Sequence, residues 1–216
     1  MRIKEYSLKI KKEIEKGLPG FDAQKKMSPS IREDLLGNIS PNENTRQSAV
    51  LILLFNENNK ISTLFIKRPT YDGPHSGQIS FPGGKCDEND KTIQETALRE
   101  TEEEIGITPS EIEILGTLTP LYIPVSNMMV HPFVGYSESK PLFQPNTQEV
   151  EYIIVTPLED LLNPSNKSIK VIRSHGRPIT APYYSIDEEM IWGATAMILS
   201  EFLVIAQKVC PFNATQ

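Results

Sequence analysis

The sequence predicts an α/β or α+β fold in which a mixed β-sheet lies between helices. Strand-like and helix-like segments are interspersed along the 216 residues, which is typical of this class. The apolar run from Ala49 to Phe55 indicates a buried strand, and Lys91 to Ile105 carries the start and stop signals of a helix. A chain of this length can bury one domain well, and it is short for two.

The first 46 residues are expected to lie around the main domain. Tyr6 to Lys16 is typical of a short charged helix, which the segment Gly17-Leu18-Pro19-Gly20 ends. Residues 21–46 contain prolines and several asparagines, and no separate core can be built from them. We therefore expect a helix and a wrapping arm over residues 1–46, and the main domain over residues 47–210.

The next segments predict a hairpin and then a short strand. Asn56 to Asn59 is a turn signal between the run at Ala49 to Phe55 and a returning strand at Ile61 to Lys67. Gln78 to Phe81 is expected to form a short strand. The segment Pro82-Gly83-Gly84 is expected to break it.

The helix at Lys91 to Ile105 has the clearest local signals. Thr92 and Glu95 have the spacing of a capping box, and Gly106 stands where a left-handed C-terminal cap is placed. The later segments predict three strands, at Glu113 to Thr119, Met129 to Tyr136 and Glu149 to Thr156, followed by a short helix at Pro157 to Leu162. One or two further strands are expected over Lys170 to Ile186, and a final helix from Glu188 or Met190 onward. Within the final helix, polar residues interrupt the apolar stretch from Ala194 to Val209, so we expect an amphipathic helix and not a membrane span.

Charge and cysteine content exclude several classes of protein. The formal net charge is -6 and no basic tract is present, which gives no support for binding a nucleic-acid backbone. No segment is apolar for long enough to span a bilayer, and the N-terminal residues lack the core of a signal peptide. Cys86 and Cys210 belong to no CxxC or Cys/His cluster, which argues against a disulfide framework or a zinc site. We therefore expect a cytoplasmic protein with neither nucleic acid nor membrane as a partner.

Acidic residues gather on one face of the predicted helix. At about 100° per residue, Glu100, Glu103 and Glu104 fall within about 100° of arc. Glu102 points to the opposite side. Glu104 lies at the edge of the apolar stripe, where a carboxylate costs free energy unless something neutralises it.

A divalent cation is the neutralising group that this helix predicts. Arg99 can pair with Glu103 at i,i+4 spacing, but one cation cannot balance three acids. Carboxylate ligands without soft donors favour Mg²⁺ or Mn²⁺ over zinc or copper. The alternative is a solvated acidic face that binds nothing. The preceding Gly-Gly turn, the convergence of the acids and the buried-edge position of one of them weigh against that alternative.

With these residues in place, the sequence resembles the Nudix hydrolase family. Gly84 and the segment from Arg99 to Ile107 are similar to the Nudix box, which runs Gly, a spacer, Glu, a second spacer, then Arg-Glu-apolar-x-Glu-Glu-x-Gly-apolar. The spacing from the first Gly to the Arg is one residue longer than usual. Lys91 therefore falls where the first Glu is expected, and Asp90 is the nearest acid. Thr101 replaces the usual apolar residue.

These departures resemble one branch of the family, the coenzyme A pyrophosphatases, which has the same extra residue and an Asp in that loop. A second signature of the branch, ending in His-x-Gly-Gln-x-x-Phe-Pro-Gly-Gly, is matched at His75, Gly77, Gln78, Phe81, Pro82, Gly83 and Gly84. Arg68 matches its arginine, and the likeness runs roughly from Ala49 to Leu203. Pro69 stands where the branch has Ser, and Gly73 and Pro74 stand where it has basic residues.

The resemblance implies a Nudix-type mixed sheet sandwiched between helices, and it implies roles for the box residues. Glu103 and Glu104 are then the core metal ligands, and the backbone carbonyl of Gly84 is a further ligand. Glu100 is either a ligand or the general base. Arg99 orients the glutamates by ion pairing.

Residues outside the helix have open interpretations. Glu149 is either a base that assists the box or a surface acid at the start of a strand. His75 is either a substrate contact or a loop histidine fixed by local hydrogen bonds. Arg68, Gln78 and Lys85 are the other candidate substrate-binding residues.

The implied activity is metal-dependent cleavage of the pyrophosphate bond in a nucleoside diphosphate derivative, a small molecule. In the branch that the chain resembles, coenzyme A or an acyl-CoA gives 3',5'-ADP and 4'-phosphopantetheine. Two alternatives stay open: the same chemistry on ADP-ribose or a dinucleotide, and a nucleotide-sensing module without turnover. The intact Glu100, Glu103 and Glu104 weigh against the sensing module. The sequence leaves the oligomeric state open.

Overall fold

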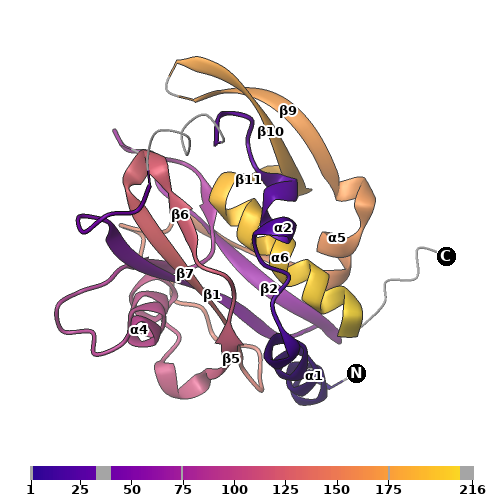
Figure 1. The fold of residues 1–216 in the computed structure, drawn as a ribbon. Helices are drawn as coiled ribbons and strands as arrows, with labels where there is room; N and C mark the ends of the chain where they lie inside the picture. Colours follow the sequence, from indigo (N-terminus) through magenta and orange to yellow (C-terminus); the bar gives the residue numbers. More distant parts are fainter. Residues whose placement is uncertain (1, 33–39, 74, 175, 210–216) are drawn as a thin grey trace.

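The fold is a mixed β-sheet with helices on both faces (Figure 1), which confirms the predicted class. The computed structural model describes residues 2–32, 40–73, 75–174 and 176–209. Within these residues, eight strands form one sheet: β1 (Arg46–Glu57), β2 (Lys60–Lys67), β3 (Ile79–Ser80), β4 (Gly83–Lys85), β5 (Glu113–Thr117), β6 (Leu121–Ile123), β7 (Met128–Tyr136) and β8 (Tyr152–Pro157). β1 and β7 run parallel, whereas β2 and β4 pair with β1 in the antiparallel direction. The sheet is therefore mixed, with β1 at its centre.

Burial on both faces explains the continuous apolar run in β1. Ile52 packs into one core with α6 (Gly193–Val209). Leu51 and Leu53 point the opposite way and pack into a second core with α4 (Ile93–Ile105). The period-2 alternation of a strand thus places neighbouring residues of β1 in two different layers.

The predicted hairpin between β1 and β2 is present. Asn58 and Asn59 make its turn, with φ of +50° and +65°. Two residues in the left-handed region give the tight turn that matches the twist of the strands, and asparagine tolerates that region better than most residues. The turn is shorter than expected, because the ladder continues as far as Glu57 and Lys60.

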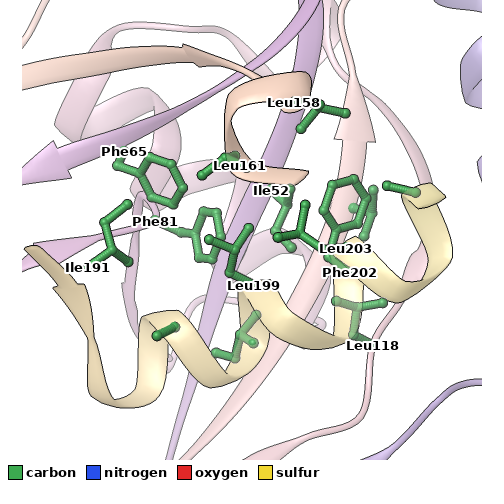
Figure 2. Close-up of a cluster of buried hydrophobic side chains, with 14 of the residues drawn as sticks. Ile52, Phe65, Phe81, Leu118, Leu158, Leu161, Ile191, Leu199, Phe202 and Leu203 are labelled. Atoms are coloured by element: carbon green, nitrogen blue, oxygen red, sulfur yellow. The ribbon is translucent and has the colours of Figure 1, made fainter. Parts of the chain in front are cut away.

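The helices form the outer layers of the fold. α6 lies across one face of the sheet with α1 (Ile3–Lys16) and α2 (Phe21–Gln24) beside it, and α4 covers the other face (Figure 1). Figure 2 shows the α6 core, where Leu199 and Phe202 point into the same cluster as Phe65 and Phe81. The shorter helical segments are α5 (Leu158–Leu162), η1 (Lys25–Met27), η2 (Pro109–Glu111), η3 (Pro124–Ser126) and η4 (Pro164–Asn166).

A small antiparallel sheet follows near the C-terminus, in the order β11–β10–β9. Its strands are β9 (Lys167–Ser174), β10 (Arg177–Ile186) and β11 (Glu189–Trp192). Of the one or two strands expected over residues 170–186, the structure therefore has two. The hairpin of β9 and β10 arches away from the main sheet (Figure 1).

The final helix begins later than predicted. Asp187 and Glu188 have φ of +48° and +66° and turn the chain into β11, so the helix begins at Gly193 and not at Glu188 or Met190. Local sequence does not reveal β11, because its pairing with β10 is what makes it a strand. The helix is also more buried than an amphipathic one, since Ser200 and Glu201 are 4% and 0% exposed.

Glu201 is buried because it holds the N-terminal arm. Its carboxylate accepts hydrogen bonds from Thr119 Oγ1 at 2.7 Å, Gln24 Nε2 at 2.8 Å and the Gly20 amide at 3.0 Å. The amide of Thr119 also donates to it, at 3.2 Å. These donors replace the water that a buried carboxylate loses, and they fix the start of the arm on the main domain.

The N-terminal segment shares the core of the main domain. α1 begins at Ile3 rather than Tyr6, and both residues lie in the cluster that contains α6. The expected boundary between residues 46 and 47 falls at the first residue of β1. Residues 33–39 of the arm, Pro74 and the expected domain end at residue 210, with Cys210, lie outside the described residues. Among those described, we find no helix with the length and apolar character needed to cross a membrane.

Candidate active site

Gly83 and Gly84 lie between the central strand and the carboxylate helix. The expected strand break is present at Phe81 and Pro82, after the end of β3, but it does not extend over the two glycines, because Gly83–Lys85 forms β4 and pairs with β1. A Cβ on Gly83, whose φ is +146°, would lie 2.2 Å from the carbonyl oxygen of Ala49. A Cβ on Gly84 would lie 2.2 Å from Oε2 of Glu100. Glycine is therefore required at Gly83 for the backbone to approach β1 this closely, whereas a side chain at Gly84 would displace the Glu100 carboxylate.

Glu104 is the most deeply buried carboxylate of the helix. It is 3% exposed, and its Oε2 accepts a hydrogen bond from the Gly83 amide at 2.8 Å. Burial raises the pKa of Glu104 to about 8; the neighbouring carboxylates of Glu100 and Glu149 also raise it, while the Gly83 amide and Arg68 act in the opposite direction. No ion pair forms between Glu104 and any residue that the structure describes, so its charge lacks a direct partner.

Glu100 and Glu103 are joined through Arg99. Nη1 of Arg99 donates to Oε1 of Glu100 at 3.0 Å and to Oε2 of Glu103 at 3.0 Å, which includes the expected i,i+4 pair. Glu100 is half-buried, and burial raises its pKa. Glu103 is exposed, and Glu102 is exposed on the opposite side as predicted.

Asp90 holds the other side of the Arg99 guanidinium. Nε of Arg99 donates to Oδ1 of Asp90 at 2.9 Å, and Nη2 donates to Oδ2 at 2.9 Å. Thr96 Oγ1 donates to the same Oδ2 at 2.8 Å, and Nη2 of Arg99 also donates to the carbonyl of Lys85 at 3.1 Å. Hydrogen bonds from Arg99 hold the pKa of Asp90 well below its usual range. Sequence reasoning gave Asp90 no role, although its place as the nearest acid to the missing Glu of the box was the signal for one.

Thr101 also has a structural reason for replacing an apolar residue. It is fully buried, and its Oγ1 donates to the Ala97 carbonyl one turn earlier at 2.7 Å. The hydroxyl is therefore satisfied by the main chain of its own helix, which lets threonine occupy a buried position.

Glu149 lies in a turn and does not open a strand. β8 begins at Tyr152, and the Glu149 amide donates to the Asn146 carbonyl at 2.9 Å. Its side chain is exposed, yet its charge raises the pKa of both Glu100 and Glu104. The fold thus brings Glu149 within electrostatic range of the helix carboxylates from a distant part of the sequence.

A cavity of about 350 Å³ adjoins β4. Its wall includes all four expected substrate contacts, which are Arg68, His75, Gln78 and Lys85. His75 has a φ of +66°, and its Nδ1 lies 3.1 Å from Oε1 of Gln78, so the local hydrogen bond that sequence reasoning left open is present. The start of α6 forms another part of the wall, through Ala194, Thr195 and Ile198.

The cavity is cationic although the chain is acidic. Arg46, Arg68 and Lys85 line it, and no Asp or Glu is among its described lining residues. None of these three cations pairs with a carboxylate in the described part of the chain. Sequence reasoning missed Arg46, although period-2 alternation along β1 places it on the same face as Ser48 and Val50, which also line the cavity.

Comparison with known proteins identifies the family. The sequence matches the NUDIX domain over residues 45–174. This chain belongs to the Nudix family. It is a pyrophosphohydrolase, as the family match and relatives named Nudix hydrolases indicate.

Two curated relatives and one solved structure illustrate the likeness. An uncharacterized Nudix hydrolase NudL of Pectobacterium atrosepticum is 33% identical over 82% of this chain and 88% of its own length. The human mitochondrial coenzyme A diphosphatase NUDT8 is 34% identical over 70% of this chain and 65% of its own length, so the match spans less than two thirds of that relative. The crystal structure of a MutT/nudix family protein from Enterococcus faecalis has a TM-score of 0.53 at 16% identity, covers 84% of this chain and 75% of its own, and supports the fold alone.

The Nudix carboxylates suit a divalent cation by their chemistry. Among the described residues, no three His, Cys, Asp or Glu side chains converge closely enough to enclose a metal ion. On the helix, Glu103 is turned to Arg99 and its side chain is 52% exposed. The donor set is nevertheless all oxygen, and the buried Glu104 lacks a paired cation, which is the environment that Mg²⁺ or Mn²⁺ fits.

Proposed function

We propose that this chain hydrolyses the pyrophosphate bond of coenzyme A or an acyl-CoA, giving 3',5'-ADP and 4'-phosphopantetheine. One observation carries the proposal: a cationic cavity, with no carboxylate among its described lining residues, adjoins the Gly83–Gly84 strand, and the carboxylate helix packs against that strand. A polyanionic nucleotide fits the cavity, and a divalent cation fits the helix. The name of the human relative, a coenzyme A diphosphatase, supports the choice of substrate.

In this proposal Glu100, Glu103, Glu104 and the carbonyl of Gly84 hold the metal. When bound, Mg²⁺ or Mn²⁺ supplies neutralisation of the phosphate charge and activation of water. Arg99 is a positioning residue, because its guanidinium fixes Glu100 and Glu103 while Asp90 fixes the guanidinium.

Glu149 is proposed as the general base. Its carboxylate is exposed to solvent and lies within electrostatic range of Glu100 and Glu104, so it can accept a proton from a water held beside the cluster. Glu100 is the alternative base on the helix, but its Oε1 already accepts from Arg99.

Arg68, His75, Gln78 and Lys85 are proposed as substrate contacts. Pro69 and Gly73 lack the side chains that coenzyme A pyrophosphatases have at these places. The cations of the cavity come instead from β1, the end of β2 and β4, so the missing basic residues do not leave it neutral.

A second candidate substrate is ADP-ribose or a dinucleotide, which the absence of basic residues around Gly73 favours. Its hydrolysis would depend on the same carboxylate helix, because the residues of the cavity wall, and not the helix, determine which substrate binds. The sensing module without turnover would have no use for the full set of glutamates. A cytoplasmic location, and the absence of nucleic-acid or membrane partners, stay predictions.

Product analysis tests the proposal. Coenzyme A, ADP-ribose and NADH are each incubated with the protein and Mg²⁺ or Mn²⁺, and the products are separated by ion-exchange chromatography. We expect preferred release of 3',5'-ADP from coenzyme A. Preferred cleavage of ADP-ribose or NADH would reject coenzyme A and keep the chemistry, whereas tight nucleotide binding with no cleavage would favour the sensing module.

A further inference from the structure

Arg46 and Ser126 lie side by side in the wall of the cavity, and neither is among the proposed substrate contacts. Arg46, the first residue of β1, and Ser126, the last of η3, both line it. Ser48 pairs with Lys85 across β1 and β4, and Arg46 lies two residues before Ser48 on the same face. The side chains of Arg46 and Lys85 thus belong to neighbouring positions on one wall, about 7 Å apart along the strand direction.

The guanidinium of Arg46 is held in place but not neutralised. One Nη2 hydrogen bond goes to the Ser126 carbonyl at 2.6 Å, and the backbone amide of Arg46 donates to the Asn127 carbonyl at 3.1 Å. A guanidinium has five N–H donors, so most of them remain available. No carboxylate pairs with Arg46 in the described residues.

The hydroxyl of Ser126 is the second unused group. Ser126 is 8% exposed, and its buried Oγ has no hydrogen-bond partner among the described residues. A buried hydroxyl without a partner costs free energy unless a ligand completes it. Because Ser126 lines the cavity beside Arg46, a phosphate oxygen placed there would accept from both.

A comparable pair of groups comes from the β2 and β3 side of the cavity. The Nε of Arg68 and the Oγ of Ser80 are also buried without partners among the described residues. On β1, Val50 pairs with Gly83, whose amide donates to Glu104, whereas Arg46 lies four residues earlier, about 13 Å along the strand. The cavity therefore has anion-binding groups on more than one element, and Arg46 lies away from the part of β4 that contacts Glu104.

We propose that Arg46 and Ser126, with Lys85 beside them, form a subsite for a phosphomonoester of the substrate that is not part of the cleaved anhydride. The identity of the nucleotide rests on the proposed function, in which the substrate carries a 3'-phosphate. The subsite makes this group a determinant of substrate choice. A purely structural role, in which Arg46 only ties η3 to β1, predicts no preference for a nucleotide with the extra phosphate.

Calorimetric binding of two nucleotides to the full chain, with a chelator present, separates these roles without relying on turnover. 3',5'-ADP carries the extra phosphate, and 5'-AMP lacks it. We expect wild-type protein to bind 3',5'-ADP about tenfold or more tightly than 5'-AMP, which is the range for a charge-assisted contact. Arg46→Gln, which keeps an N–H for the Ser126 carbonyl, should bring the ratio to about one and leave 5'-AMP binding unchanged. Ser126→Ala should lower the ratio several-fold, and Arg173→Gln on the exposed β9 should not alter it.

Equal binding of the two nucleotides by the wild type, or an equal loss of both in Arg46→Gln, would overturn the subsite. Such a result, together with cleavage of coenzyme A by the wild type, leaves the proposed function standing. An Arg46-dependent preference in a protein that does not cleave coenzyme A supports the subsite and rejects the proposed substrate instead.

Discussion

Asp90 and Arg99 form a two-point ion pair across the start of α4, with Nε–Oδ1 and Nη2–Oδ2 distances of 2.9 Å. Asp90 lies before the helix, and Arg99 lies on the face that also carries Glu100 and Glu103. One guanidinium therefore connects the loop after β4 with the proposed metal ligands. The extra residue in this loop is compatible with the family's box because Asp90 reaches the arginine from its shifted position.

Removing the charge of Asp90 should lower stability in a pH-dependent way. The pKa of Asp90 is depressed in the folded state, so the ionised carboxylate stabilises the fold. This contribution to the free energy of unfolding is fully present above the pKa of an unfolded Asp, about 3.9, and is lost as pH falls through the folded-state pKa. We expect Asp90→Asn to reduce the free energy of unfolding by about 1–3 kcal/mol at pH 7. Urea unfolding of both proteins in chelator at pH 7, 5, 4 and 3 should show this difference shrinking below about pH 4. A difference that stays constant down to pH 3 would contradict the role given to the pair.

A methyl group on Gly84 should disable the site. Its Cβ would lie 2.2 Å from Oε2 of Glu100 and 2.4 Å from Cδ, so the glutamate must move away from its place beside β4. We expect Gly84→Ala to lower kcat by about 100-fold, the effect of displacing a catalytic group by about 1 Å. Thermal unfolding measured in parallel should show a fold that persists. Unchanged turnover would mean that the contact between Gly84 and Glu100 has no role in catalysis.

The elements predicted best are those whose ends are fixed by nearby residues. Thr92 Oγ1 accepts from the Glu95 amide at 3.1 Å, and Gly106 ends the helix with a φ of +75°. Glu95 departs from the capping box in one detail, because its carboxylate accepts from the Lys91 amide. Both ends of α4 could be placed from the sequence because every partner lies within a few residues.

The strands that escaped prediction depend on pairing with a neighbouring strand. Gly83–Lys85 is a strand only because β1 lies beside it, and Glu189–Trp192 is one only because β10 does. The residues of the candidate site also fall into two groups, those that local sequence indicates and those that only the fold brings together. The glutamates and the four proposed substrate contacts follow from local motifs, whereas Arg46 and Ser126 are brought to the cavity by the fold from other elements.

Loss of the buried Glu201 should loosen the N-terminal arm. Its carboxylate receives hydrogen bonds from the side chains or amides of Gly20, Gln24 and Thr119, and truncation leaves these buried donors unsatisfied. We expect Glu201→Ala to lower the free energy of unfolding by about 2–4 kcal/mol and to speed proteolysis within the arm. Glu138→Ala is the matched control, because its ion pair with Lys4 is exposed to solvent and its loss should leave the free energy of unfolding nearly unchanged. Equal free energies of unfolding for the Glu201→Ala protein and this control would show that Glu201 does not hold the N-terminal arm in place.

Turnover of isosteric variants tests whether the carboxylates on the acidic face of α4 are needed for metal-dependent hydrolysis. Glu103→Gln and Glu104→Gln each remove one charge from that face, whereas Glu102→Gln removes one from the opposite, exposed side of the same helix. Release of 3',5'-ADP from coenzyme A is measured with Mg²⁺ for all three variants, with circular dichroism to confirm folding. We predict background turnover for Glu103→Gln and Glu104→Gln and wild-type turnover for Glu102→Gln. Wild-type turnover by both Glu103→Gln and Glu104→Gln would show that these carboxylates are not needed for hydrolysis.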